Sequence, residues 1–421
     1  MNDNRAAAQI IESLRKGIPP QHGIDQYAVG NEKFMENIAK WHLSGLGDRG
    51  IIRFISGSWG AGKTHFFRQM RELAFANGCM VSNVELGKSE APLDKFERVF
   101  YSIVRRIATP ISYERGGFEE AAPFGIVLRE TLAYLGSGVR SLPEVTTYDQ
   151  FHTAEGILMA NLSIDIDFKK MVVEYWRTFV PDAVEPSLQE QTRAEILQWF
   201  GGEGTIGTYR RRFLVNKTVN KDNAKAMLQA LAGFVRLAGY RGLVILFDEA
   251  EMSFTAMRNT QLKDAHNNLL ALINNVEALA GLFLIYATVP EFFNDQKHGI
   301  EQYGALAGRI GKPQKHPPRA LDNIWDLDKL ETGLPEYQAA ARKIRDIYAL
   351  AYQEADSILP SDNEMDKFIS SLDMEHPRLA GVRFWRVLVT CTVRHCDNLM
   401  EGYVQPAPQV YEDMMDSLRD L

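Results

Sequence analysis

The most constraining feature of the sequence is a glycine-rich loop between a predicted strand and a predicted helix. Residues 57–64 read G-S-W-G-A-G-K-T and fit the pattern G-x-x-x-x-G-K-[ST] at every position. An apolar run at residues 51–56 precedes the loop, and a helical pattern at residues 63–77 follows it. A strand that passes through such a loop into a helix is typical of a parallel sheet covered by helices. The motif therefore predicts an α/β fold with a parallel sheet.

The loop also predicts a chemistry. Glycines let the backbone wrap closely around phosphate oxygens, and the start of the helix adds a positive dipole end. Lys63 would reach the β- and γ-phosphates, and the Thr64 hydroxyl would ligate Mg²⁺. An ordinary glycine-rich turn is the alternative, which the flanking strand and helix disfavour. The residues expected to bind the nucleotide are Gly57, Ser58, Trp59, Gly60, Ala61, Gly62, Lys63, Thr64 and His65.

A buried-strand pattern ending in two acids supplies the second half of this site. Residues 243–247 are continuously apolar, as in a central strand buried on both faces, and Asp248 and Glu249 follow. We expect Asp248 to share the Mg²⁺ with Thr64 and Glu249 to polarise the attacking water. An exposed acidic pair at a turn is the alternative, and Glu251 is interpreted as a surface residue.

Two further polar residues are candidates for catalysis. Thr288 ends the next predicted strand, so in a parallel sheet its hydroxyl would lie at the same edge as the loop and could sense the γ-phosphate. Arg309 could act as an arginine finger on a neighbouring subunit. The alternatives are a purely structural threonine and a solvated arginine.

Hydrophobic periodicity outlines the rest of the chain. Predicted strands lie at residues 51–56, 79–86, 243–247, 282–288 and 323–327. Predicted helices lie at residues 4–16, 32–46, 63–77, 93–107, 168–180, 193–200, 223–237 and 261–280, and the chain from residue 335 onward is helical. The 421 residues suggest two or three domains. We expect an N-terminal helical segment at 1–47, a core at 48–330 with a helical insertion at about 110–240, and a helical region at 331–421.

Composition excludes several classes of protein. The net charge of −7 argues against a polycation, and the longest apolar stretch, residues 278–289, is too short to span a bilayer. The three cysteines, Cys79, Cys391 and Cys396, are interpreted as reduced thiols, and the N-terminus lacks a signal-peptide pattern. Cys391 and Cys396 flank His395, but without a second pair a zinc site is disfavoured. We therefore expect a cytoplasmic protein without a membrane segment.

The order of these motifs resembles AAA+ ATPases, which have an α/β P-loop core and a C-terminal helical lid. The likeness runs from about Gly30 to the C-terminus. In the lid, Arg383 resembles the sensor-2 arginine of initiator-like members, and Arg378 competes for that role. The resemblance also implies an adenine pocket where Gly23, Ile24 and Tyr27 approach the P-loop, with a plain loop as the alternative.

A narrower resemblance rests on two short segments. Residues 13–19, S-L-R-K-G-I-P, and residues 88–93, K-S-E-A-P-L, resemble the BREX-system ATP-binding (BrxD-like) family of bacterial anti-phage defence loci. That family is usually encoded beside a superfamily 2 helicase. Trp59 departs from the pattern, since an aromatic residue at this position resembles KAP-type P-loop NTPases, which usually carry membrane segments.

These resemblances imply a function, and three interpretations stay open. The first is a Mg²⁺-dependent ATPase that self-associates and acts with a helicase on DNA in defence. The second is a nucleotide-gated switch or scaffold that hydrolyses ATP slowly and recruits or regulates the helicase. In the third, the chain contacts DNA directly through Arg210, Arg211 and Arg212, a run whose simpler interpretation is a solvated helix face.

Overall fold

The computed structural model describes residues 3–87, 90–114, 123–250, 257–295, 299–330, 332–352, 355, 357–375 and 384–419. The chain divides into two compact units. The first unit comprises Met1–Asn37, Ile55–Glu72 and Pro313–Leu421, and the second comprises Ile38–Phe54 and Leu73–Lys312. Each unit is therefore assembled from segments that are distant in the sequence.

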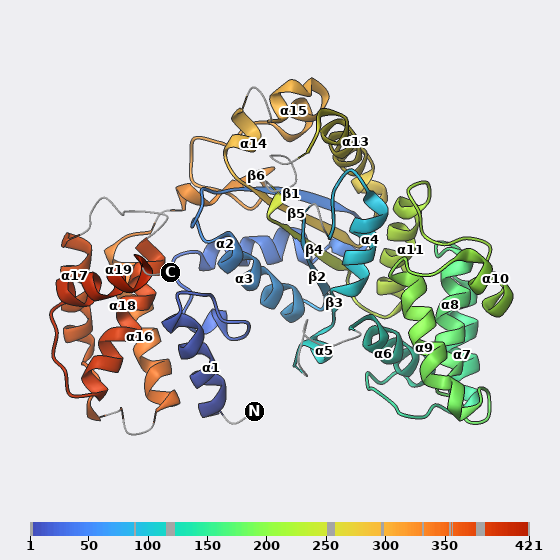
Figure 1. Ribbon diagram of the computed structural model, residues 1–421, viewed down its shortest axis with the longest axis horizontal. Coiled ribbons are helices and arrows are strands. Elements are labelled where there is room, and N and C mark those ends of the chain that lie inside the picture. The colour runs from blue at the N-terminus through green and yellow to red at the C-terminus, as the bar shows by residue number, and fades with distance from the viewer. Residues whose placement is uncertain are drawn as a thin grey trace. The chain divides into compact units, whose positions relative to one another are not determined.

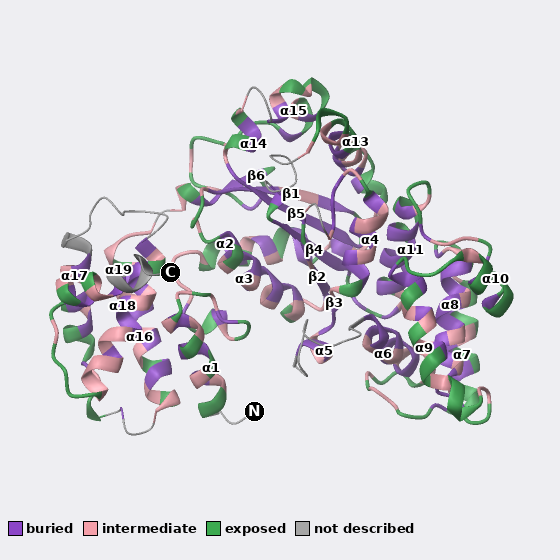
Figure 2. Ribbon diagram, in the orientation of Figure 1, coloured by how far each residue is buried: buried purple, intermediate pink, exposed green. Residues whose placement is uncertain are grey.

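A six-stranded, mostly parallel sheet runs through the fold, as the sequence predicts (Figure 1). Its strands are β1 (Ile51–Ser56), β2 (Met80–Glu85), β3 (Ile107–Ala108), β4 (Leu243–Asp248), β5 (Leu282–Thr288) and β6 (Ile324–Asp326), in the order β3-β2-β4-β5-β1-β6. Strands β2, β4 and β5 are parallel, with Glu85 opposite Asp248 and Phe247 opposite Tyr286. Every residue of β4 and β5 is buried, which explains their continuous apolar runs (Figure 2).

Two boundaries differ from the prediction. The helix expected at residues 93–107 is α4 (Phe96–Arg105), and Ile107–Ala108 instead form β3, antiparallel to β2. The helix expected at residues 32–46 is α2 (Glu32–Ile38), followed by a wider π-type turn at Ala39–Leu43 and a 3₁₀ turn at Leu46–Asp48. In both places the apolar pattern continues across the boundary, so periodicity alone gives no stop signal.

The segment between β3 and β4 is helical. Its helices are α5 (Pro110–Glu114), α6 (Pro123–Ser137), α7 (Tyr148–Ala160), α8 (Ile166–Arg177), α9 (Pro186–Phe200), α10 (Ile206–Phe213) and α11 (Ala224–Leu237). The helices α6–α11 gather in one group (Figure 1). The buried Trp176 joins α8 to α6 by donating its indole N–H to the carbonyl of Leu128 at 2.7 Å. This hydrogen bond therefore connects two helices of the group.

The second unit also holds the helices that follow β4 and β5. These are α13 (Asn259–Asn275), a 3₁₀ turn at Val276–Ala278, α14 (Glu291–Asn294), a 3₁₀ turn at Ile300–Gln302 and α15 (Gly304–Ile310). The buried His266 of α13 lies against Tyr303, with ring centroids 5.1 Å apart. Burial lowers the pKa of His266 to about 4.

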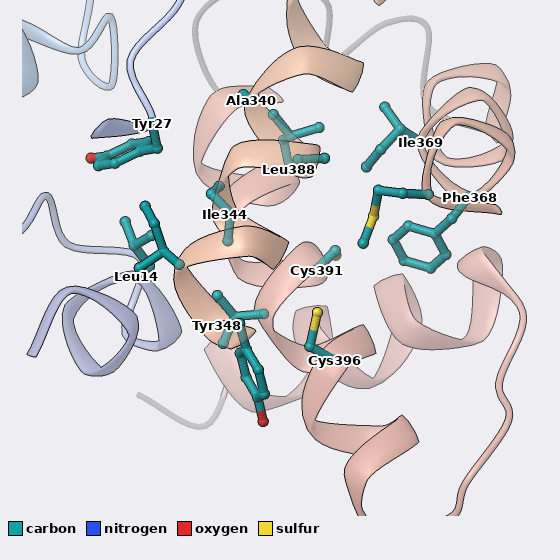
Figure 3. Packing of buried hydrophobic residues seen from close by; sticks show 14 of the residues in the cluster. Leu14, Tyr27, Ala340, Ile344, Tyr348, Phe368, Ile369, Leu388, Cys391 and Cys396 are labelled. Carbon is teal, nitrogen blue, oxygen red and sulfur yellow. The ribbon is translucent and has the colours of Figure 1, made fainter. Parts of the chain in front are cut away.

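The first unit joins the two ends of the chain in one hydrophobic core. Its helices are α1 (Asp3–Arg15), α2, α3 (Lys63–Ala76, of which the second unit takes the end), α16 (Leu334–Ala351), α17 (Asp362–Glu375), α18 (Phe384–Met400) and α19 (Ala407–Arg419). Figure 3 shows Leu14 beside Ile344 and Tyr348 of α16, and Tyr27 belongs to the same buried cluster. The guanidinium of Arg15 forms an ion pair with Asp397, with 2.7 Å between Nη2 and Oδ1, and so connects α1 to α18.

The cysteines lie inside these cores. Cys79, Cys391 and Cys396 are buried and free, and burial raises the pKa of each thiol to about 12. The ring of His395 stacks on that of Phe368, with 4.0 Å between the two ring centroids. In the described residues, no group of three His, Cys, Asp or Glu side chains could hold a metal ion. No helix among them has the length and apolarity that crossing a bilayer requires.

Candidate functional site

The glycine-rich loop connects β1 to α3 in a conformation that demands its glycines. Gly60 and Gly62 have φ of 84° and 85°, a region that side chains with a Cβ rarely adopt. A Cβ on Gly57 would lie 2.9 Å from the Cβ of Ala61 and 3.3 Å from Cγ of Lys63. The loop therefore closes tightly on itself, and larger residues at these positions would open it.

Lys63 is the first residue of α3, and its side chain folds back over the loop. Its Nζ donates hydrogen bonds to the carbonyls of Gly57 at 2.7 Å and Ser58 at 3.3 Å. It also lies 5.6 Å from the ring centroid of Trp59, whose side chain is 64% exposed. A buried ammonium group needs such partners because it has lost most of its water. The ammonium group of Lys63 is therefore held against the loop.

Ser58 is anchored from a distant part of the chain. Its backbone N–H and its hydroxyl both donate to Oδ2 of Asp328, at 2.9 and 2.7 Å. Asp328 belongs to a 3₁₀ turn, Leu327–Lys329, that directly follows β6. The sequence gives no signal for this contact, because 270 residues separate the two partners.

The first turn of α3 presents two polar side chains with different environments. Thr64 is exposed, whereas His65 is partly buried and its Nδ1 lies 3.4 Å from the hydroxyl of Tyr27. The two rings meet edge to face at 5.6 Å. Burial, helped by the positive charge of Arg68, lowers the pKa of His65 to about 4. His65 is therefore neutral near pH 7.

The N-terminal segment expected to form an adenine pocket does lie against α3. The backbone N–H groups of Gly23 and Ile24 donate to Oε1 of Glu72, at 2.9 and 3.4 Å. Burial, followed by the charge of Asp25, raises the pKa of Glu72 to about 7. Glu72 thus engages two backbone N–H groups of this segment, and the adenine pocket stays a prediction.

The acidic pair lies at the end of β4 in the second unit. Asp248 is buried, with 8% exposure, and its Oδ1 accepts a hydrogen bond from the backbone N–H of Glu249 at 2.9 Å. Glu249 is exposed and has φ of 52°. A non-glycine residue in the left-handed region is strained, and such strain often marks a functional position. Asp248 is therefore the last residue of β4, and the backbone leaves the strand conformation at Glu249.

The remaining predicted catalytic residues have different surroundings. Thr288 ends β5 and is completely buried, and within the described residues no group hydrogen bonds to its Oγ1. Arg309 is exposed in the last turn of α15. Arg383 and its competitor Arg378 lie outside the described residues, as does Glu251.

The arginine run in the insertion is less uniform than its sequence suggests. Arg212 forms an ion pair with Glu195 and donates to the hydroxyl of Thr192 at 2.6 Å, so it ties α10 to α9. Arg210, Arg211 and Arg212 are all exposed. Within the described part of the chain, Arg212 has an ion pair to a neighbouring helix, whereas none is found for Arg210 or Arg211.

Comparison with known proteins identifies the family. A family model described as "BREX system ATP-binding protein BrxC/D" matches residues 3–381. The chain belongs to this BREX family. The match confirms the resemblance drawn from the two short segments and the P-loop, and it establishes ATP as the ligand class. No curated protein and no solved structure matches the chain significantly.

The residues present fit the ATP that this BREX family binds. The loop combines two left-handed glycines, a lysine and the start of a 14-residue helix, which is the arrangement that cradles phosphate groups. Mg²⁺ prefers hard oxygen ligands and usually takes one or two protein oxygens together with phosphates and water. The exposed Thr64, directly after Lys63, carries a hydroxyl oxygen of that kind.

Proposed function

We propose that the chain is a Mg²⁺-dependent ATPase with an AAA+-like core, working in BREX defence. The observation that carries the proposal is the loop conformation, in which Gly60 and Gly62 adopt left-handed φ values directly before Lys63 at the start of α3. A loop of this kind binds phosphate through backbone N–H groups, so its glycines serve binding more than folding.

In this proposal each polar residue has one task. Lys63 leaves the carbonyls of Gly57 and Ser58 to contact the phosphates, a change that exchanges hydrogen bonds without burying a bare charge. Thr64 and Asp248 hold Mg²⁺, which when bound offsets the charge of the phosphates. Glu249 accepts a proton from the attacking water.

The strand order supports the assignment of Asp248 and Glu249 to the same nucleotide. Only β5 separates β1, which leads into the loop, from β4, which carries the acidic pair. The carboxyl ends of parallel strands are where open α/β sheets bind ligands. Thr288 ends β5, the strand between them, and is proposed to sense the γ-phosphate.

The proposal includes self-association and a helical lid. The exposed Arg309 would act as a finger on a neighbouring subunit. The helices α16–α19 would form the lid, with Arg383 or Arg378 as the sensor arginine. A cytoplasmic location, a superfamily 2 helicase partner and action on DNA are proposed from the BREX family.

Glu249→Gln tests the enzymatic part of the proposal. The amide cannot accept a proton, so ATP turnover is expected to fall at least a hundredfold while ATP affinity, measured by calorimetry, stays within about threefold. Lys63→Ala, by contrast, is expected to abolish binding. Full turnover by Glu249→Gln would remove Glu249 from the mechanism.

Native mass measurement separates the ATPase from the alternative, a nucleotide-gated switch. Glu249→Gln would be examined with and without ATP, DNA and the helicase. An ATP-dependent homo-oligomer, with turnover that rises with protein concentration and is lost in Arg309→Ala, supports the ATPase. A monomer that binds the helicase only with ATP, with flat specific activity, supports the switch.

A further inference from the structure

We propose that Asp328 is a positioning residue for the phosphate-binding loop. It contacts no nucleotide atom in this proposal, and it acts through Ser58, whose peptide it fixes. The inference rests on the proposed ATP site and adds a residue that the motif itself does not contain.

Ser58 forms hydrogen bonds through its backbone N–H, its hydroxyl and its carbonyl. One carboxylate oxygen of Asp328 accepts from both its backbone N–H and its hydroxyl, at 2.9 and 2.7 Å. On the other side, the Ser58 carbonyl accepts from the N–H of Ala61 at 3.0 Å and from Nζ of Lys63 at 3.3 Å. Fixing the Ser58 N–H and hydroxyl therefore also limits where its carbonyl, and with it the lysine, can lie.

The carboxylate comes from a rigid support. Three residues before it in the sequence, Trp325 of β6 is completely buried. Its ring packs edge to face on Phe34 of α2, with 5.5 Å between ring centroids, and on Phe66 of α3, with 6.0 Å. Its indole N–H donates to the carbonyl of Ala320 at 3.3 Å. Because Phe66 lies in the helix that the loop opens, one aromatic cluster holds both Asp328 and α3.

The charge of Asp328 makes its two hydrogen bonds stronger than neutral ones. Without this carboxylate, the backbone N–H and the hydroxyl of Ser58 would both lose their acceptor, and the first peptide of the loop would sample other orientations. Nucleotide binding would then have to order the loop, which lowers affinity. The chemical step, carried by other residues, would proceed as before in the bound complex. The expected signature is a raised KM and Kd with an unchanged kcat.

The test compares four variants in the full-length chain. Asp328→Ala removes both hydrogen bonds and is expected to raise the Kd for ATP about tenfold. Asp328→Asn keeps a carbonyl acceptor and is expected to raise it about threefold. Ser58→Ala removes one donor and should have an intermediate effect. In Asp328→Ala/Ser58→Ala, the hydroxyl has already lost its partner, so the Kd should match that of Asp328→Ala alone.

Asp322→Ala is the matched control. Asp322 is an acid of the same region whose carboxylate accepts from the backbone N–H of Arg319 at 2.8 Å, and its loss should leave the Kd unchanged. Thermal melting checks that each variant folds, and Asp328→Asn keeps the test informative if Asp328→Ala does not.

Three results would overturn the positioning role. The first is an unchanged Kd in Asp328→Ala. The second is tighter binding in this variant, which would mean that the carboxylate repels phosphate. The third is a fall in kcat at constant KM. Failure of the ATP site itself is a different outcome, because the wild-type chain would then show no ATP binding.

Discussion

The backbone N–H of Glu249 donates to Oδ1 of the preceding Asp248 at 2.9 Å, and Glu249 adopts φ of 52°. The carboxylate of Asp248 thus stabilises a backbone conformation that is unfavourable for the residue after it. A left-handed residue with a Cβ costs about 1–2 kcal/mol relative to an ordinary conformation. This local cost is consistent with a position selected for chemistry.

Replacing Glu249 by glycine is therefore expected to stabilise the fold while removing activity. Glycine adopts the same φ without steric cost, which stabilises the folded chain. Its greater conformational entropy in the unfolded chain offsets part of this effect. The unfolding free energy should therefore rise by about 1 kcal/mol. Urea denaturation measures it, beside ATP turnover. Glu249→Ala, which keeps a Cβ, is the control and should show no gain. Equal stabilities for the two variants would contradict strain at this position.

Sequence patterns predicted the sheet and the loop because both depend on local signals. Strands β1 and β5 match their predicted bounds, since glycine and polar residues flank their apolar runs. The strand β3 was missed because Ile107–Ala108 continue the apolar stripe of α4. Asp328 and the strain at Glu249 could not be predicted, because one depends on a contact 270 residues apart and the other on a backbone angle.

Gly57→Ala is expected to weaken ATP binding more than tenfold with little effect on global stability. The new Cβ would lie 2.9 Å from the Cβ of Ala61, so the loop must open around it. Calorimetry measures the affinity, and thermal melting measures the fold. Gly87→Ala is the matched control because a Cβ there meets nothing within 4 Å. Equal affinities for both variants would mean that the loop's closure does not matter for binding.

The three arginines at positions 210–212 should differ in how much each contributes to stability. Arg212→Ala breaks the contacts with Glu195 and Thr192 and is expected to lower the unfolding free energy by about 1–2 kcal/mol. Arg210→Ala/Arg211→Ala should leave stability within about 0.5 kcal/mol. If the chain contacts DNA here, only that double variant loses salt-dependent binding while fully folded. DNA binding equal to wild type in the double variant would exclude this face.

Protonation of His395 should contribute to acid sensitivity. Burial lowers its pKa from 6.5 to about 4, so the unfolded chain binds the proton more readily between these pH values. The stability that the neutral ring contributes is present above pH 6.5 and is lost as the pH falls toward 4. His395→Phe keeps the stacking on Phe368 and removes the titration.

Between pH 7.5 and 5, His395→Phe is expected to lose roughly 1–2 kcal/mol less unfolding free energy than the wild type. Chemical denaturation at the two pH values measures the difference. His65 and His266 have similarly lowered pKa values, so part of the acid sensitivity should remain. His152→Phe is the control, because this exposed histidine pairs with Glu155 at the surface. An identical pH profile in wild type and His395→Phe would show that His395 does not titrate as expected.

Thr288→Val offers the sharpest separation of a functional hydroxyl from a structural one. Thr288 is completely buried, and in the part of the chain that the structure describes its Oγ1 has no hydrogen-bond partner. Burying an unpaired hydroxyl is unfavourable, so the isosteric valine should keep or raise stability. If the hydroxyl senses the γ-phosphate, ATP turnover should nevertheless fall about tenfold or more.

Thr392→Val is the control, because the hydroxyl of this buried threonine donates to the carbonyl of Leu388 at 2.7 Å and its loss should leave turnover unchanged. Full turnover in Thr288→Val would assign the threonine to packing alone.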